Sequence, residues 1–396
     1  MYNLPQLYSI NFFMHSLSLR RILFFAVTLF SYSCTSVKKL TQTTAGISSL
    51  RYIGQYEIPF NLEYKNTTVG GLSGIDYDTK TGLYYMICDD RSDKSPARFY
   101  TARVLFNQSK IDTVIFTGMK YLLQQNGAVY PNNKQDRFHV PDPEAMRYDP
   151  TRKQLVWSSE GERIVNAKDT VLENPTVTII STKGVYKNSF ALPANLTMHA
   201  TENGPRKNSV LEGMSFADDY KTLFISAEEP LYEDGPGADV TDNNAYTRIY
   251  KFAVAGKNSL AQYAYRLSPV AYPAVPETAF KINGITDILS IGNNKLLVIE
   301  RSFSTGRLPC TIKLFIADLN GATDISKMVL KNNIDFIPAA KKLLLNMYDL
   351  GIYTDNIEGV TFGPLLPNGH KTLLFIADNN FNPFEKAQIL LFEVIE

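Results

Sequence analysis

The sequence predicts an all-β protein, a single β-propeller of four-stranded blades, on three observations. One pattern occurs five times: a Gly-centred turn, an apolar strand, a turn, and a second apolar strand that ends on an acid. These acids recur at intervals of about 70 residues, which leaves room for four strands, their turns and a variable loop. The composition, with 23 Tyr, 23 Phe and few long helical periods, suits a large sheet protein.

Each copy of the pattern accounts for half a blade. The copies span residues 71–91, 143–160, 211–229, 283–301 and 357–378. Two further β-rich stretches follow most copies, for example 248–252 and 262–265 after the third. We therefore expect each repeat to form one blade, and five blades in all.

The ring is expected to close through the N-terminal end of the propeller. After the last copy only one further strand is evident, at 388–394, whereas an unassigned strand-like segment at 51–58 precedes the first copy. The N-terminal segment would complete the last blade and remove the exposed edges of an open array. The propeller domain is thus predicted over residues 51–396.

The first fifty residues differ in character. Arg20 and Arg21 precede an apolar stretch at 22–30, too short for a membrane span, and small residues lead to Cys34. This predicts a signal peptide over residues 1–34, with Cys34 where a bacterial lipoprotein carries its lipid. Plain signal cleavage is the alternative, because Tyr32 is larger than the residue usual at that place.

These features predict a location in the bacterial cell envelope, on the periplasmic side of a membrane as a lipoprotein, or secretion. Residues 35–50, rich in Ser, Thr and Lys, would form a flexible tether. Translation could begin at Met1 or at Met14, since the residues before Met14 add nothing to a signal peptide. Membrane contact is expected only through the lipid anchor.

The net charge excludes one class of binding partner. A net charge of +1 creates no positive field that would attract a polyanion, so we expect no nucleic acid partner. We also expect the protein to be a monomer.

The two cysteines that follow Cys34 lie in different repeats. We therefore predict that Cys88 and Cys310 are two separate buried thiols rather than a disulfide.

Three Glu side chains are the candidate catalytic residues. Glu144, Glu212 and Glu358 occupy the same place in the second, third and fifth repeats, where the first has Ser73 and the fourth Thr286. The inner strands of a propeller run along its axis, so residues at equivalent ends converge on one mouth of the central channel.

The acids that end the second strands would lie nearby and are candidate metal ligands. They are Asp89, Glu160, Glu228, Glu300 and Asp378. Carboxylates crowded in this way repel one another unless a cation neutralises them. Oxygen ligands without His or Cys clusters favour Ca²⁺ over zinc. Alternatively, each acid could pair with a neighbouring blade and serve only the architecture.

Three arginines are candidate substrate-binding residues. Arg91, Arg206 and Arg301 could hold the oxygens of an anionic ester beside the calcium site while an activated water attacks. The alternative for Arg91 and Arg301 is a salt bridge to the adjacent acids. Serine-esterase chemistry is not supported, because no Gly-x-Ser-x-Gly motif is present.

The chain resembles the phytase-like propeller family, described as esterase-like proteins of the phytase family. The resemblance rests on nine short motifs: LSGID (72–76), DDR (89–91), SPARF (95–99), DPEA (142–145), PRKN (205–208), LEG (211–213), DGP (234–236), NIEGV (356–360) and DNNF (378–381). The resemblance runs from about residue 50 to the C-terminus. It implies a hydrolase-like fold with an acidic central channel, and it supports calcium. Established phytase propellers are more distant relatives with six blades, so six blades stay possible.

Three functions fit these observations. The preferred one is an exported metal-dependent ester hydrolase that acts on phosphoesters, with a small anionic ester as substrate. The second is a calcium-dependent lactonase or carboxylic-ester hydrolase, which would use one metal and a carboxylate base. The third is a non-catalytic propeller that binds a sugar, peptide or protein. Phosphate sites need converging basic groups, so Arg91, Arg206 and Arg301 pointing apart would remove the phosphoester hydrolase.

Overall fold

The computed structural model describes residues 46–332 and 335–396. The predicted signal peptide, Cys34 and most of the predicted tether lie outside the described residues. Among the described residues, no helix is long and apolar enough to cross a membrane. The helical elements within residues 46–332 and 335–396 are three 3₁₀ turns, η1 (Ala194–Leu196), η2 (Tyr232–Asp234) and η3 (Met347–Leu350).

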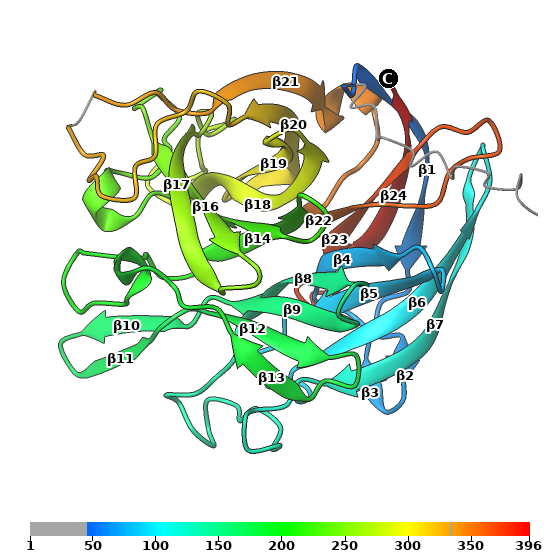
Figure 1. Cartoon of the computed structure of the whole chain (residues 1–396), viewed down its shortest axis with the longest axis horizontal. Coiled ribbons are helices and arrows are strands. Elements are labelled where there is room, and N and C mark those ends of the chain that lie inside the picture. Colours follow the sequence, from blue (N-terminus) through cyan, green and yellow to red (C-terminus); the bar gives the residue numbers. More distant parts are fainter. Residues whose placement is uncertain (1–45, 333–334) are drawn as a thin grey trace, which may run out of the picture. The chain divides into compact units, whose positions relative to one another are not determined.

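Twenty strands form five antiparallel four-stranded sheets, which confirms a propeller of five blades (Figure 1). Blade 1 contains β4 (Leu72–Asp78), β5 (Leu83–Cys88), β6 (Arg98–Phe106) and β7 (Ile111–Tyr121). Blade 2 contains β8 (Pro143–Asp149), β9 (Gln154–Ser159), β12 (Thr176–Ser181) and β13 (Tyr186–Ser189). Blade 3 contains β14 (Leu211–Ala217), β15 (Thr222–Ala227), β16 (Tyr246–Ala253) and β17 (Asn258–Arg266).

The last two blades are built in the same way. Blade 4 contains β18 (Lys281–Gly292), β19 (Lys295–Ser304), β20 (Arg307–Asp318) and β21 (Ala340–Asn346). Blade 5 contains β22 (Asn356–Phe362), β23 (Thr372–Asp378), β24 (Ala387–Ile395) and β1 (Ser49–Ile58). Two small hairpins lie outside the blades, β2 (Glu63–Tyr64) with β3 (Thr67–Thr68) and β10 (Glu162–Asn166) with β11 (Asp169–Glu173).

The N-terminal strand closes the ring, as the sequence predicts. β1 pairs antiparallel with β24 from Ser49 opposite Ile395 to Ile58 opposite Ala387. In Figure 1 the blue β1 runs beside the red β24. The last blade therefore joins the two ends of the propeller, and each inner strand has neighbours on both sides.

Every inner strand carries a β-bulge at the same place. The register shifts between residues 72 and 74 in β4, 143 and 146 in β8, 211 and 213 in β14, 285 and 287 in β18, and 357 and 359 in β22. A bulge interrupts the alternation of a strand and re-aims one side chain. The residues in these bulges are Ser73, Glu144 with Ala145, Glu212, Thr286 and Glu358. The equivalence predicted for these five positions is therefore confirmed.

In β4, β14 and β22 a glycine follows the bulge residue, at places where neighbouring inner strands approach closely. A Cβ on Gly74 would lie 2.9 Å from the carbonyl oxygen of Glu144, and one on Gly213 would lie 2.8 Å from the amide nitrogen of Ile288. Real Cβ atoms do not tolerate such distances, so glycine is required for the neighbouring strands to approach. This requirement explains the Gly of the repeated motif in the first, third and fifth copies.

A buried ion pair fills the axis beyond the bulges. Arg147 of β8 contacts both carboxylate oxygens of Asp287 of β18, at 2.6 and 2.8 Å. Arg147 also donates to the carbonyl oxygens of Ile75 and Met214, and Asp287 accepts from the amide of Val360 at 2.8 Å. The pair thus bonds to the inner strands of all five blades and forms a polar floor beneath the acidic mouth.

Candidate active site

The acids that end the second strands lie at equivalent places in four blades. The amide of Asp89 donates to Gly71, that of Glu160 to Asp142 and that of Glu228 to Val210, while Asp378 lies opposite Asn356. In each case the acid faces the residue two positions before the bulge glutamate or serine. The register therefore places Asp89, Glu160, Glu228 and Asp378 around one end of the channel.

Blade 4 departs from this register by one residue. Glu300 lies opposite Ile285, and Arg301 lies opposite Gly284. Arg301 is therefore the structural equivalent of the acids that end the second strands in the other blades. The spacing of about 70 residues between those acids predicts Glu300 instead. A shift of one residue along a strand turns the side chain to the other face of the sheet.

Glu300 accordingly belongs to a separate network. Its carboxylate accepts from the Tyr265 hydroxyl at 2.8 Å, from the Lys341 ammonium at 2.5 Å and from the Ser268 amide at 3.0 Å. These groups neutralise and satisfy the buried carboxylate. The structure thus does not bring Glu300 together with the other candidate metal ligands.

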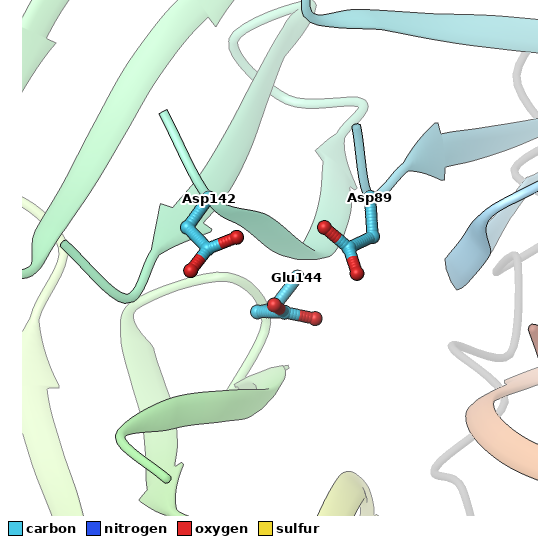
Figure 2. Close-up of side chains that lie close together, drawn as sticks. All are labelled: Asp89, Asp142 and Glu144. Atoms are coloured by element: carbon cyan, nitrogen blue, oxygen red, sulfur yellow. The ribbon is translucent and has the colours of Figure 1, made fainter. Parts of the chain in front are cut away.

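Two groups of carboxylates converge at the mouth, and they share Glu144. In the first group, oxygen atoms of Asp89, Asp142 and Glu144 lie within 4.8 Å of one another (Figure 2). In the second group, oxygen atoms of Glu144, Glu160 and Glu212 lie within the same distance. Figure 2 shows the three carboxylates of the first group facing one common space.

Several of these carboxylates have no protein partner. Glu144 and Glu212 are each only 8% exposed. Within the described residues, no hydrogen bond or ion pair reaches the carboxylates of Asp89, Glu144 or Glu212. The Oδ2 atom of Asp378 is also buried without a partner. Unsatisfied buried carboxylates of this kind are costly, so they require a proton or a cation.

The titration of these groups reflects this crowding. Burial, followed by repulsion from the neighbouring acids, raises the pKa of Glu144 and Glu212 well above the usual range, and the same holds for Asp89 and Glu160. Burial raises the pKa of Asp142 to about 6 although Arg91 opposes the shift. Without a cation, these buried carboxyl groups therefore bind protons more readily than exposed carboxyl groups do.

Arg301 neutralises the acids on the opposite side of the mouth. It donates to Glu228 at 2.7 Å and to Glu358 at 2.6 Å, and its side chain is 15% exposed. Gly284 makes room for this arrangement, because a Cβ there would lie 2.4 Å from Cγ of Glu228. Burial alone would lower the pKa of Arg301, but Glu228, Glu358 and Glu212 together raise it above its ordinary value.

The other two arginines have partners elsewhere. Arg91 donates to Asp142 at 2.9 Å and to Glu162, the first residue of β10, at 2.7 Å. Arg206 donates to the carbonyl oxygens of Pro230 and Gly235 at 2.9 and 2.7 Å and stacks on Tyr232 with 4.4 Å between guanidinium carbon and ring centroid. The three predicted substrate-binding arginines therefore share no protein partner.

The bulges without an acid bind the next blade. The Ser73 hydroxyl donates to the carbonyl of Glu144 at 2.7 Å, and the Thr286 hydroxyl donates to the carbonyl of Ile357 at 2.9 Å. Both hydroxyls therefore connect neighbouring inner strands. This difference explains why carboxylates occupy only three of the five bulge positions.

Two residues of the site were not among the predicted site residues. Asp142 belongs to the first carboxylate group, and its place two residues before Glu144 is a signal that the sequence offers. Glu162 holds Arg91 at the edge of that group, but no pattern marks it, because it follows the repeated motif. Cys88 and Cys310 are free and buried, as predicted.

Fold and site together define a β-propeller with a polycarboxylate site at one end of its channel. The chain belongs to the phytase-like family, described as "esterase-like activity of phytase", whose model matches residues 67–381. Membership of this family supports an activity of the ester hydrolase kind. No curated protein matches the sequence.

Solved structures show only a distant likeness. An exo-beta-1,3-galactanase from Phanerochaete chrysosporium is 14% identical with a TM-score of 0.43, and the alignment covers 86% of this chain and 64% of the galactanase. A periplasmic gluconolactonase from Pseudomonas aeruginosa is 11% identical with a TM-score of 0.35, covering 83% and 90% of the two chains. A putative 6-phosphogluconolactonase from Bacteroides uniformis is 12% identical with a TM-score of 0.35, covering 80% of each chain.

Proposed function

We propose that this protein is a metal-dependent ester hydrolase whose cation is held by the two carboxylate groups at the propeller mouth. The observation that carries the proposal is the convergence of five acids, with Glu144 shared between the groups and with Glu144 and Glu212 buried without partners. A protein that used these acids only to join its blades would have satisfied them, as it satisfies Glu300.

The donor set fits Ca²⁺. Asp89, Asp142, Glu144, Glu160 and Glu212 offer only carboxylate oxygens, and no His or Cys takes part in either group. A bound cation would offset the repulsion among the carboxylates and polarise an ester oxygen. Among the described residues, these are the groups of carboxylates close enough to share a cation, and they include acids without a protein partner.

The chain's own residues would then divide the work. Of the second group, we assign Glu144 and Glu160 to the cation and leave Glu212 free of it. Burial and Glu160 raise the pKa of Glu212, so its carboxyl can hold a proton and give it to the departing oxygen. Glu358 is already held by Arg301 and by the Asn356 amide at 2.8 Å. We therefore assign Glu358 a positioning role, with Glu144 as the shared cation ligand.

A phosphoester is the first candidate substrate. The separate partners of Arg91, Arg206 and Arg301 remove them as a shared phosphate pocket, so this candidate rests on the cations that two adjoining carboxylate groups could hold, which would attract a doubly charged phosphoryl group. A lactone or carboxylic ester is the second candidate. It is favoured by the arginines, since Arg91, Arg206 and Arg301 all donate to protein partners already. A non-catalytic binding module has less support, because it gives no reason for unpartnered buried acids.

A calcium titration followed by activity screening tests the proposal. The protein is assayed on phosphomonoesters, aryl esters and lactones, before and after chelation, with Glu212→Gln beside the exposed control Glu202→Gln. We expect calcium-dependent hydrolysis in one class, reduced at least about 100-fold in Glu212→Gln and unchanged in the control. Hydrolysis indifferent to both chelation and Glu212→Gln, or none in any class, would remove the proposal.

We also infer export with lipid attachment at Cys34, supported by the charged, apolar and small-residue order of the N-terminal sequence. The full chain and Cys34→Ser are compared by radiolabelled fatty acid incorporation and membrane fractionation. Label and membrane retention should be lost in Cys34→Ser. Equal retention without label in both proteins would exclude the anchor.

A further inference from the structure

We propose that Lys207 binds the anionic oxygens of the substrate at the rim of the carboxylate site, and that Arg206 positions it. The ligand class is a phosphoryl group carrying two negative charges, and the inference rests on the proposed function. It assigns anion recognition to a residue other than the three predicted arginines.

Lys207 keeps exposed donors, whereas the unpartnered Nε of Arg301 is buried. Its ammonium lies 3.9 Å from Oε1 of Glu162, too far for a hydrogen bond, and its side chain is 55% exposed. Within the described residues, Glu162 is its one salt-bridge partner, and its charge also acts to lower the pKa of Asp142. The Arg91 and Arg301 guanidinium groups are held by carboxylates, and that of Arg206 by carbonyls.

The backbone that carries Lys207 is held on both sides. Before it, Arg206 bonds to the carbonyl oxygens of Pro230 and Gly235 and stacks on Tyr232. After it, the Ser209 hydroxyl donates to the Glu229 carboxylate at 2.8 Å. A fixed main chain with a free ammonium limits the entropy lost when an anion binds.

The stack beneath Lys207 is itself braced. Arg163 of the β10–β11 hairpin lies on Tyr232 with 4.8 Å between guanidinium carbon and ring centroid, and it donates to the Tyr232 hydroxyl at 3.1 Å. Tyr232 thus contacts both Arg163 and Arg206. This explains the bonding of Arg206 to carbonyls: its guanidinium supports the loop and leaves the next residue to meet the ligand.

Lys207 also lies beside the first carboxylate group. Glu162 accepts from Arg91 at 2.7 Å, and Arg91 holds Asp142, a member of that group, at 2.9 Å. Two cations, Arg91 and Lys207, therefore meet at Glu162 on the edge of the site. A phosphoryl group at the carboxylate site could take the Lys207 ammonium without breaking a hydrogen-bonded ion pair, and a lysine serves phosphate well as a point charge.

Binding of inorganic phosphate to the calcium-loaded, full-length protein tests this inference. We compare wild type, Lys207→Met and Lys168→Met by isothermal titration calorimetry; Lys168 is an exposed lysine at the turn of the β10–β11 hairpin. The dissociation constant of phosphate should rise about tenfold in Lys207→Met and stay unchanged in the control. Equal binding by wild type and Lys207→Met, or no binding to wild type, overturns the inference.

A double variant distinguishes positioning from general support of the fold. Arg206→Lys keeps the charge but loses the planar fork, so it should weaken phosphate binding in the wild-type background and add no further loss to Lys207→Met. Additive losses would overturn the role given to Arg206. The protein could also bind phosphate through Lys207 and yet hydrolyse no ester. That result would refute the proposed function and would still support the anion site.

Discussion

At the scale of single residues, neighbouring acids at the mouth have different tasks. Glu144 belongs to both carboxylate groups and has no protein partner, whereas Glu358 is held by Arg301 and Asn356. The sequence marks both as equivalent, because both precede a small residue in the inner strand. It cannot show that one has a cationic neighbour, since Arg301 comes from another blade.

Arg301 provides the first residue-scale prediction. Arg301→Met removes the shared partner of Glu228 and Glu358, so two buried carboxylates lose their counter-ion. We expect the free energy of unfolding to fall by about 3 kcal/mol, measured by urea denaturation. Arg103→Met, at an exposed site, should change it by less than about 0.5 kcal/mol. Equal urea midpoints for Arg301→Met and wild type would show that the ion pairs of Arg301 with Glu228 and Glu358 add nothing to stability.

At the scale of elements, the β-bulge decides which side chains reach the channel. The repeated motif predicts the strands and their equivalence, because the Gly and the apolar residues are visible in the sequence. The interval between terminal acids does not predict the register of β19, in which Arg301 rather than Glu300 takes the channel position. Counting residues cannot detect a one-residue shift, and such a shift changes the face of the strand.

The close approach of inner strands gives an element-scale prediction. Gly213→Ala would place a Cβ 2.6 Å from the Ser226 hydroxyl and 2.8 Å from the Ile288 amide. The backbones must separate, so we expect a loss of about 1–3 kcal/mol in the free energy of unfolding. Gly46→Ala, with no atom within 4 Å of the added Cβ, is the matched control. A thermal denaturation midpoint equal to that of the control would contradict the proposed packing constraint.

At the scale of the whole molecule, closure by β1 and the axial pair of Arg147 with Asp287 hold five blades around one acidic mouth. The repeat and the unassigned N-terminal strand were sufficient to predict this architecture. The contents of the site were only partly predictable, because Glu162 and the partners of each arginine depend on contacts between blades. Such contacts join residues far apart in the chain and leave no local pattern.

The crowded acids predict an unusual dependence of stability on pH. Burial raises the folded-state pKa of Asp142 to about 6 and that of Glu228 to about 7, so the folded protein binds more protons than the unfolded chain. The stability of the calcium-free protein should therefore fall as pH rises from about 4 to about 7. This pH dependence is measured as the melting temperature at several pH values, once in chelator and once in calcium. In calcium, stability should instead rise with pH. A stability that rises with pH in chelator would contradict the raised pKa values of these acids.

Calcium titration by calorimetry, comparing the metal-free wild type with Glu144→Gln, tests the central claim most directly. Because Glu144 is common to both carboxylate groups, its loss should weaken calcium binding about 100-fold or more, while the exposed control Glu202→Gln binds as wild type does. The account predicts tight binding that disappears with Glu144. Absence of calcium binding to the wild type, or unchanged affinity in Glu144→Gln, would contradict it.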